Sequence, residues 1–276
     1  MTGHLYLVSL PIGNLEDITL RAIKTLRAVD LIVAEDTRNT RRVLERYQIK
    51  TPFSRSYYQG VESKRVEPIL SLLKEGKDLA LVSDAGTPLV SDPGYPLVRA
   101  TIEAGIPVIP IPGPTAAITA LVASGLPTDH FVFDGTVPRK QGERRVYFEA
   151  IREGQRTIIL YESPHRLLAT LKEIAKVLPE RRVVLARELT KIHEEFLRGS
   201  ADEILQTLNA RGEVKGECVL LIEGEKRSAR KTEPHNVKKA VLLLKKEGIP
   251  NKTAIKILMC CLDLPRNEAY RLVHTD

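Results

Sequence analysis

Short apolar runs alternate with segments of helical spacing in the first half of the chain. The runs cover residues 5–10, 31–34, 79–83 and 108–111, and the helical segments cover residues 18–28, 41–47, 61–74, 96–104 and 115–123. Apolar strands that alternate with helices are typical of a parallel or mainly parallel sheet covered on both faces. The pattern therefore predicts an α/β lobe over residues 1–127.

A second α/β lobe is predicted over residues 128–225. Strand-like runs lie at residues 157–161, 182–186, 195–198 and 218–223. Ser163 and Pro164 suit the N-cap and first position of a helix, and Ser200 with Glu203 has the pattern of a capping box. The short spacings around residues 188–199 favour antiparallel hairpins. We expect the two lobes to meet near residues 127–139.

The C-terminal residues 226–276 differ from both lobes. A polar linker at residues 226–234 is followed by helical patterns at residues 237–247, 252–262 and 266–273. Turn signals at Gly248 and at Pro265 separate these patterns, as in a helix-turn-helix module. The predicted fold class is therefore α/β with two lobes and mixed sheets, followed by a small all-α module.

Composition narrows the class of protein. A hydrophobic fraction of 43% and a charged fraction of 28% are ordinary for a globular protein with packed cores. No apolar run approaches the ~20 residues of a membrane-spanning helix, and the first ten residues lack the regions of a signal peptide. We therefore expect a cytoplasmic protein without a membrane partner. The three cysteines and six histidines have no disulfide or zinc-ligand spacing, so no metal is expected.

The net charge changes the expected partner. Lys and Arg outnumber Asp and Glu by 42 to 35, which gives a formal charge of +7. Residues 226–256 alone hold ten basic and two acidic residues. Cationic surface favours nucleic acid because binding releases condensed counterions. A basic surface that only keeps the protein soluble explains the charge almost as well.

Turn-rich loops follow the predicted strands of the first lobe, at residues 10–14, 35–38, 82–95 and 111–117. Ligands of open α/β sheets bind at the carboxyl ends of strands. Each loop also has an ordinary interpretation: Asn14 and Asp17 are placed to cap the next helix, and Asp36 could be an exposed N-cap. None matches a dinucleotide-binding or P-loop pattern, so the ligand need not carry phosphates.

Polar residues also follow the predicted strands of the second lobe. They lie at residues 161–166 and 187–195 and include acids, bases and a histidine. Each can be explained as a solvated helix turn or loop. Their recurrence at strand ends favours a pocket that binds a substrate.

Several of these segments together resemble one family, the tetrapyrrole-methylase superfamily. They are Pro11-Ile-Gly-Asn14, Glu35-Asp-Thr-Arg38, Ser83-Asp-Ala-Gly-Thr-Pro88 with Ser91-Asp-Pro-Gly94, Pro112-Gly-Pro114, and Glu162-Ser-Pro-His-Arg166. The resemblance spans residues 4–225 and is strongest to the branch that methylates cytidine 2′-hydroxyls of small-subunit (16S) ribosomal RNA. It implies a substrate nucleotide in the decoding region.

The resemblance also implies a two-lobe tetrapyrrole-methylase-like fold, a homodimer, and S-adenosylmethionine bound between the lobes. By position, the cofactor contacts would be Ile12, Gly86, Thr87, Val90, Thr115, Ala116 and Glu162. Relatives that methylate tetrapyrroles carry Gly-Asp-Pro where this chain has Gly86-Thr-Pro88. Backbone contacts at this loop survive the change, whereas a carboxylate contact does not.

Methyl transfer to a ribose requires that the 2′-hydroxyl be aligned with the methyl group and that water be excluded. A nearby base would help by removing the hydroxyl proton. Candidate bases are Glu35, Asp36, Glu162, His165 and Lys191, and a mechanism by positioning alone is also open. Candidate phosphate contacts on ribosomal RNA, as part of the small subunit, are Arg38, Arg139, Lys140, Arg144, Arg145 and Arg166. The sequence does not choose among the bases, because the choice depends on geometry.

Two other functions fit parts of the sequence. A methylase of the same fold could act on a corrin or porphyrin precursor, whose carboxylates suit a basic cleft, although a small substrate needs no basic tail. A helix-turn-helix DNA-binding regulator that senses a metabolite could use the tail. Its second helix is rather apolar, with Ile255, Leu258 and Met259, which favours packing in a core over reading DNA.

Overall fold

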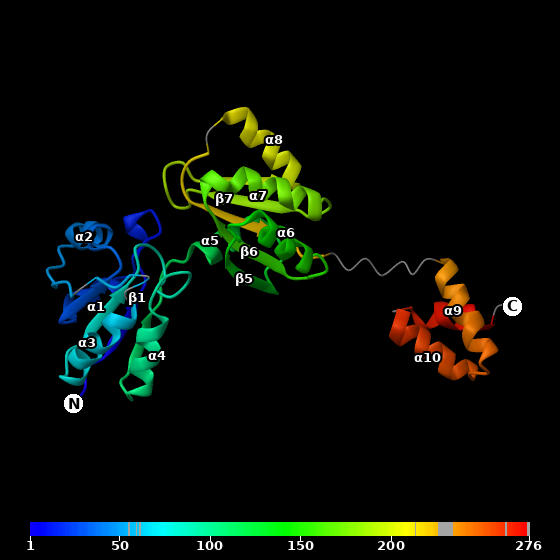
Figure 1. The fold of residues 1–276 in the computed structure, drawn as a ribbon, viewed down its shortest axis with the longest axis horizontal. Coiled ribbons are helices and arrows are strands. Elements are labelled where there is room, and N and C mark those ends of the chain that lie inside the picture. Colours follow the sequence, from blue (N-terminus) through cyan, green and yellow to red (C-terminus); the bar gives the residue numbers. More distant parts are fainter. Residues whose placement is uncertain are drawn as a thin grey trace. The chain divides into compact units, whose positions relative to one another are not determined.

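The computed structural model describes residues 1–54, 56–58, 60, 62–212, 214–225, 234–262 and 264–274. The chain forms two compact units, Met1–Gly224 and Glu225–Asp276 (Figure 1). Of the expected polar linker, residues 226–233 lie outside the described part. Within the described ranges, no helix is long and apolar enough to cross a membrane.

The first unit begins with a four-stranded parallel sheet. Its strands are β1 (Leu5–Val8), β2 (Leu31–Ala34), β3 (Leu79–Val82) and β4 (Val108–Ile111), in the order β2-β3-β1-β4. All pairs are parallel, as predicted. The helices are α1 (Leu20–Ala28), α2 (Thr37–Arg46), α3 (Glu62–Lys74), α4 (Tyr95–Glu103) and α5 (Ala116–Ser124), with a 3-10 turn at Leu15–Asp17.

Local hydrogen bonds determine where the early helices begin. Asn14 accepts from the Glu16 amide and caps the 3-10 turn, whereas the side chain of Thr19 caps α1. The expectation that Asp17 caps α1 was wrong, because Asp17 lies inside the 3-10 turn. Asp36 is the N-cap of α2, so this helix starts four residues before the apolar spacing indicates.

The second sheet has five strands in the order β5-β6-β9-β7-β8. They are β5 (Phe131–Thr136), β6 (Thr157–Glu162), β7 (Val183–Arg187), β8 (Glu195–Gly199) and β9 (Cys218–Ile222), with helices α6 (Gln141–Ala150), α7 (Pro164–Val177) and α8 (Ala201–Arg211). Only β5 and β6 are parallel, and β7 with β8 forms the expected hairpin. The capping box of Ser200 and Glu203 is also present.

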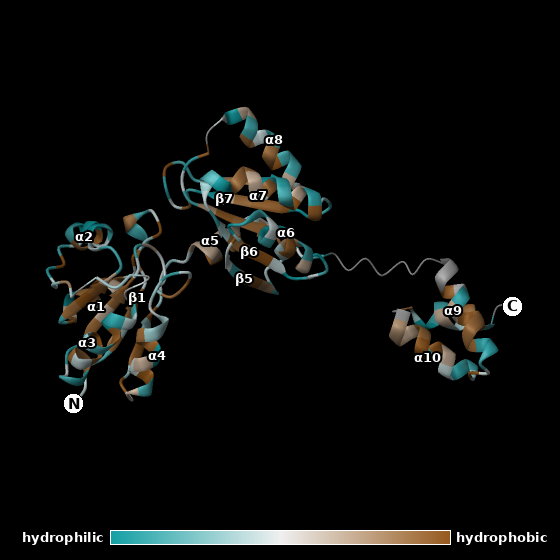
Figure 2. Cartoon of the chain, viewed as in Figure 1, coloured by the Kyte–Doolittle hydropathy of each residue, from teal (hydrophilic) through white to brown (hydrophobic). Residues whose placement is uncertain are grey.

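Neither β5 nor α6 was predicted from the sequence. Strand β5 lies where we expected the junction between lobes, and most of its residues are exposed or half-buried. An edge strand of this kind lacks the continuous apolar run that revealed the central strands. Apolar residues concentrate on the central strands and on the helix faces that cover them (Figure 2).

Helix α5 connects the two sheets. It follows β4 of the first sheet, but it packs on β6, β7 and β9 of the second. Ala120 and Leu121 share a buried apolar cluster with Ile159 and Leu221, and Ile12 from the loop after β1 joins it. The strand-end loops of the first sheet are thereby held against the second sheet.

The second unit contains three described helices, α9 (Pro234–Lys246), α10 (Asn251–Leu262) and α11 (Arg266–His274). Its core comprises Val241, Ala254, Leu258, Ala269 and Val273. Leu258 is buried as expected for a packed helix, whereas Met259 is exposed. This unit therefore has its own small hydrophobic core.

Candidate functional site

A cavity of about 500 Å³ lies in the first unit, at the carboxyl ends of β1, β3 and β4. Strand β1 is paired with both β3 and β4, so the chain crosses from one side of β1 to the other between these two strands. Open α/β sheets bind ligands at such switch points. The volume is within the range of small-molecule sites, about 300–1,000 Å³.

The loops beneath the cavity are tied to one another. Leu10 and Gly86 exchange backbone hydrogen bonds of 2.8 and 3.0 Å. The Thr87 hydroxyl donates to the Pro114 carbonyl at 3.0 Å, and its oxygen lies 3.0 Å from the hydroxyl of buried Ser9. The loops that contain Leu10, Gly86 with Thr87, and Pro114 thus form one rigid surface, which we call the floor of the cavity.

Gly86 is required by its backbone conformation. Its φ is +72°, which is unfavourable for residues with a side chain. A Cβ there would lie 3.3 Å from Ile12 Cγ2 and 3.6 Å from the Pro114 carbonyl oxygen. The glycine leaves room for a ligand to approach the backbone of this floor.

Strained residues flank the cavity on two sides. Among the described residues, non-glycine positive φ angles occur at Leu89 (70°) and Ser91 (68°) after β3, and at Glu188 (51°) and Thr190 (63°) after β7. The remaining one is Gln48. Such conformations cost energy and cluster at functional sites, where the surrounding structure holds them.

The second sheet supplies the opposite wall. Strand β9 runs antiparallel between β6 and β7, so its first residues meet the last residues of its neighbours. Gly216, Glu217 and Cys218 therefore line the cavity beside Tyr161 and Glu162. Burial raises the pKa of Cys218 to about 12, so its thiol stays protonated at neutral pH.

Tyr161 joins this wall to the start of α5. Its phenol hydrogen-bonds with the Ala117 backbone and the Thr115 side chain, and its ring contacts Phe133 edge-on at 4.9 Å. Burial raises the pKa of the phenol above its usual value despite these bonds. The uncharged Tyr161 side chain therefore connects β6 of the second sheet to the start of α5.

Glu162 lies in the wall with its carboxylate fully engaged. One oxygen is 2.6 Å from the Ser163 amide and 2.6 Å from the Arg166 guanidinium, and the other accepts from Thr170 at 2.6 Å. The side chain is fully buried. A buried charge needs such partners, so Glu162 has a structural role at the junction of β6 and α7.

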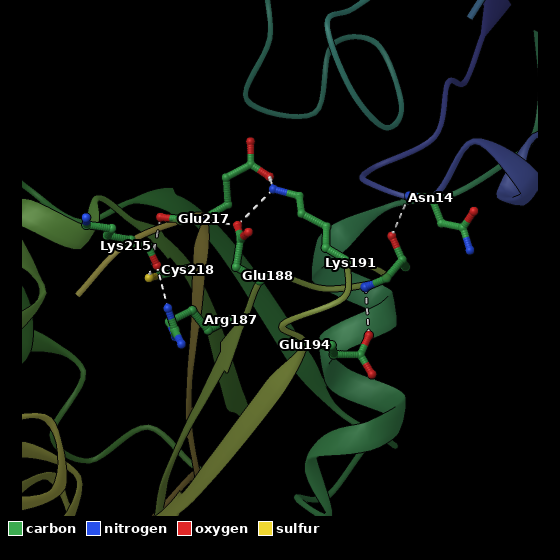
Figure 3. A network of polar contacts seen from close by, with 10 residues as sticks. Asn14, Arg187, Glu188, Lys191, Glu194, Lys215, Glu217 and Cys218 are labelled. Atoms are coloured by element: carbon green, nitrogen blue, oxygen red, sulfur yellow. Dashed lines mark hydrogen bonds and ion pairs between the residues drawn. The ribbon is translucent and has the colours of Figure 1, made fainter. Parts of the chain in front are cut away.

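A polar network joins the loop after β1 to the second sheet (Figure 3). Lys191 contacts Glu188 at 2.8 Å and Glu217 at 3.0 Å, while the Asn14 amide donates to Thr190 at 2.9 Å. Partial burial alone would lower the pKa of Lys191, but the bonds to both glutamates outweigh it and raise the pKa. Lys191 therefore stays protonated and is poorly suited to act as a base.

Carboxylates gather at the ends of β2 and β3, and one of them, Asp92, also lines the cavity. Burial, followed by the charges of Asp84 and Asp92, raises the pKa of Glu35 to about 7. Burial also raises the pKa of Asp92, and Asp84 contributes, while a hydrogen bond with Ser83 opposes the shift. Asp36 differs, because hydrogen bonds with Arg38 lower its pKa to about 2.

The structure brings together all the positions expected to contact the cofactor. They are Ile12, Gly86, Thr87, Val90, Thr115, Ala116 and Glu162, and every one of them lines the cavity. Each comes from a loop that the sequence placed at a strand end. Their role in binding stays a prediction.

The expected bases other than Glu162 are not in the lining. Glu35 and Asp36 follow the end of β2, Lys191 is in the network of Figure 3, and His165 is exposed in the first turn of α7. Asp36 is the N-cap of α2, which is the ordinary interpretation that the sequence analysis gave for this residue. None of these four side chains therefore lines the cavity.

The expected phosphate contacts divide into three groups. Arg139 and Arg166 line the cavity. Arg38, Lys140 and Arg145 are exposed and pair with nearby carboxylates. Arg144 is only 6% exposed, because it shares the inward face of α6 with Phe148, so expecting it at an RNA surface was wrong.

Several lining residues were not named individually as site residues, notably Asp92 and Tyr161, which lie in expected loops, and Gly216 and Glu217, which do not. Asp92 lies in the Ser-Asp-Pro-Gly segment that carried part of the resemblance, which was a usable signal. Gly216 and Glu217 precede a strand, so a search at strand carboxyl ends does not find them.

Comparison with known proteins identifies relatives over the whole chain. Residues 4–205 match the family described as Tetrapyrrole (Corrin/Porphyrin) Methylases. The Ribosomal RNA small subunit methyltransferase I of Synechocystis is 46% identical over 275 residues, covering 98% of this chain and 97% of that protein. The protein of the same name from Thermotoga maritima is 46% identical over 223 residues, covering 81% of this chain and 99% of that protein.

Among solved structures, the fold is similar to the uroporphyrin-III C-methyltransferase of Thermus thermophilus complexed with S-adenyl homocysteine. The TM-score is 0.54 at 19% identity, covering 80% of this chain and 97% of that one. This likeness concerns the fold, whereas the sequence identities above concern the family. The chain belongs to the tetrapyrrole methylase family of S-adenosylmethionine-dependent methyltransferases, together with the ribosomal RNA small subunit methyltransferase I proteins.

Proposed function

We propose that this protein transfers a methyl group from S-adenosylmethionine to the ribose 2′-hydroxyl of a cytidine in 16S ribosomal RNA. The observation that carries the proposal is the cavity in which all the expected cofactor positions converge. Relatives at 42–48% identity are named for methylation of small-subunit ribosomal RNA.

The residues of the cavity fit this cofactor. Gly86 leaves space that a Cβ would fill, so a flat nucleoside can lie against the backbone between Ile12 and Pro114. Ile12, Val90, Ala116 and Leu189 supply apolar contacts for a purine. S-adenosylmethionine supplies a methyl group that its positively charged sulfur makes electrophilic, and the carboxylates of the lining favour that charge.

The chain itself must bind the acceptor, orient it and exclude water. Arg139 lines the cavity and is exposed, which suits a contact with an RNA phosphate at the entrance. Arg166 is less available, because it holds Glu162 and donates to the Val137 carbonyl at 3.2 Å. We therefore assign Arg139 to the RNA and Arg166 mainly to the wall of the cavity.

The test is a methyl-transfer assay with labelled S-adenosylmethionine and small ribosomal subunits that lack the modification. We expect label in 16S RNA and, after nucleolysis, a single 2′-O-methylcytidine. Naked 16S RNA provides a second arm that identifies the form of the substrate. Label on a base, or no label in RNA, would contradict the proposal.

A tetrapyrrole substrate is the second candidate. The solved neighbours include methyltransferases of this chemistry, but at 17–23% identity they support the fold alone. A parallel assay with a tetrapyrrole precursor should give no label. Label there and none in RNA would reverse the assignment.

Three further expectations stay predictions: the homodimer, the cytoplasmic location and the target in the decoding region. Exposed Ile118 and Val122 on α5 offer apolar surface that a second copy could cover. Sedimentation at several concentrations measures the oligomeric state directly.

A further inference from the structure

The cavity contains few groups that can accept a proton. The ionisable residues in its lining are Asp92, Arg139, Tyr161, Glu162, Arg166, Glu217 and Cys218. The arginines are cations, and the raised pKa values of Tyr161 and Cys218 keep both protonated. The choice of a base therefore falls among the three carboxylates.

Two of the three carboxylates are committed elsewhere. Glu162 is fully buried, and its two oxygens are held by Ser163, Arg166 and Thr170. Glu217 has a side chain that is 73% exposed, and it pairs with the Lys191 ammonium at 3.0 Å. The first cannot turn toward a substrate, and the second faces solvent and a cation.

Asp92 has neither restriction. It is half-buried in the loop after β3 and reaches the cavity. Its loop is held in an uncommon shape by positive φ angles at Leu89, Ser91 and Gly94, and the Gly94 amide donates to Glu62 at 3.0 Å. A rigid loop fixes the direction of the carboxylate, which positioned proton transfer requires.

We propose that Asp92 is the general base that takes the proton of the ribose 2′-hydroxyl, an assignment that rests on the function proposed above. The ribose oxygen forms its bond to the methyl carbon as the bond from that carbon to sulfur breaks. Sulfur keeps the electron pair of the broken bond and becomes a neutral thioether. The hydroxyl proton passes to the Asp92 carboxylate and leaves later to water.

The surroundings of Asp92 increase its affinity for a proton. Burial comes first and the Asp84 charge second in raising its pKa, with the Ser83 hydroxyl opposing them. The Asp92 charge in turn raises the pKa values of Glu35, at the end of β2, and of the Tyr161 phenol. A base with a raised pKa takes a proton more readily.

The experiment compares wild type with Asp92→Asn in single-turnover methylation of small subunits across pH. The amide keeps the size of the side chain and removes the proton acceptor. General-base catalysis contributes about 100-fold or more to rate, so we expect the single-turnover rate constant to fall by about that factor. The wild-type rate should decline toward low pH as Asp92 is protonated, and the variant should lose this dependence.

Binding of S-adenosylhomocysteine, measured by calorimetry, provides the second readout. We expect the affinity of Asp92→Asn to stay within about threefold of wild type, since the carboxylate acts on the acceptor. Glu35→Gln removes a carboxylate of raised pKa from outside the cavity, and this variant should keep the wild-type rate at high pH and a decline of the rate toward low pH.

The outcomes separate this assignment from the proposed function. If wild type does not methylate ribose, the proposed function fails. If wild type methylates ribose and Asp92→Asn keeps the wild-type single-turnover rate constant and pH profile, only the role of Asp92 fails. Loss of S-adenosylhomocysteine binding in Asp92→Asn would assign the residue to cofactor binding and overturn its role as a base.

Discussion

The two compact units of this chain use charge in opposite ways. The unit Met1–Gly224 buries charges, pairs them and holds strained loops around a cavity. In the unit Glu225–Asp276, the described lysines and arginines are exposed, and the core is a small set of aliphatic side chains. Chemistry needs groups fixed in a dry site, whereas attraction of a polyanion needs only accessible cations.

The comparison suggests that the first unit performs catalysis and the second adds affinity. The Thermotoga relative matches this chain over 223 residues and is covered almost completely, and the first unit is 224 residues long. A relative that is matched over 223 residues thus has the same name as a relative that is matched over 275 residues. Four changes test this division of roles, in order of expected effect.

The largest effect should come from the buried pair in the first unit. Glu162→Ala leaves the Arg166 guanidinium without its buried partner, which typically costs about 3–5 kcal/mol. The melting temperature of the first unit should fall by about 10 °C, as followed by calorimetry. Glu149→Ala is the matched control, because Glu149 forms an exposed pair with Arg145 at the same i,i+4 spacing. An equal loss in both variants would contradict the structural role of Glu162.

Removal of residues 226–276 should lower the affinity for small ribosomal subunits and leave cofactor binding unchanged. We expect affinity for small subunits to fall about tenfold or more at 0.1 M salt, because the truncated protein loses its most basic segment. Binding of S-adenosylhomocysteine should be unchanged within about twofold. Filter binding measures the first quantity and calorimetry the second. Full retention of subunit affinity would remove the role assigned to the second unit.

A smaller effect should follow from changing single cations of that unit. Lys252 and Lys256 are exposed one turn apart on α10. Replacing both with Glu should weaken RNA binding and flatten its dependence on salt, by about one unit of slope for each phosphate that the protein no longer neutralises. Lys172→Glu with Lys176→Glu on α7 is the matched control, with the same spacing on the first unit. Equal losses in the two pairs would show a general charge effect.

The smallest effect concerns Glu35. Its folded pKa of about 7 exceeds the value of 4.5 expected for the unfolded chain, so the folded state binds more protons between these two pH values. Stability therefore falls as pH rises through this window. Glu35→Gln should stabilise the first unit above pH 7 by about 1 kcal/mol after solvent screening, with no gain below pH 4. Denaturant titrations at several pH values measure this, and a gain that is independent of pH would contradict the cause.

The sequence predicts the central elements of the fold well, for a physical reason. Strands β3, β6, β7 and β9 are buried along nearly their whole length, so their apolar runs stand out. Strand β5 escapes because an edge strand is only partly covered. Asp17 and Asp36 show that helix starts depend on which oxygen meets which amide, which a one-dimensional pattern does not specify.

The candidate site is predictable only in part. The loops after parallel strands could be anticipated, because parallel strands present their carboxyl ends at one edge. Gly216 and Glu217 reach the same edge from the start of β9, which runs the other way. The direction of β9 is a tertiary property, so nothing local marks these residues. The burial of Arg144 is a similar case, since charge alone does not show which face of a helix turns inward.

Helix α5 has a consequence for how this enzyme can be divided. By sequence it belongs with the strands of the first sheet, but its apolar side packs on the second. A fragment ending at residue 127 would carry α5 away and expose its apolar side, and the remaining fragment would have an uncovered sheet. The halves therefore form one folding unit that cannot be shuffled, swapped between homologues or expressed in pieces without rebuilding that shared surface.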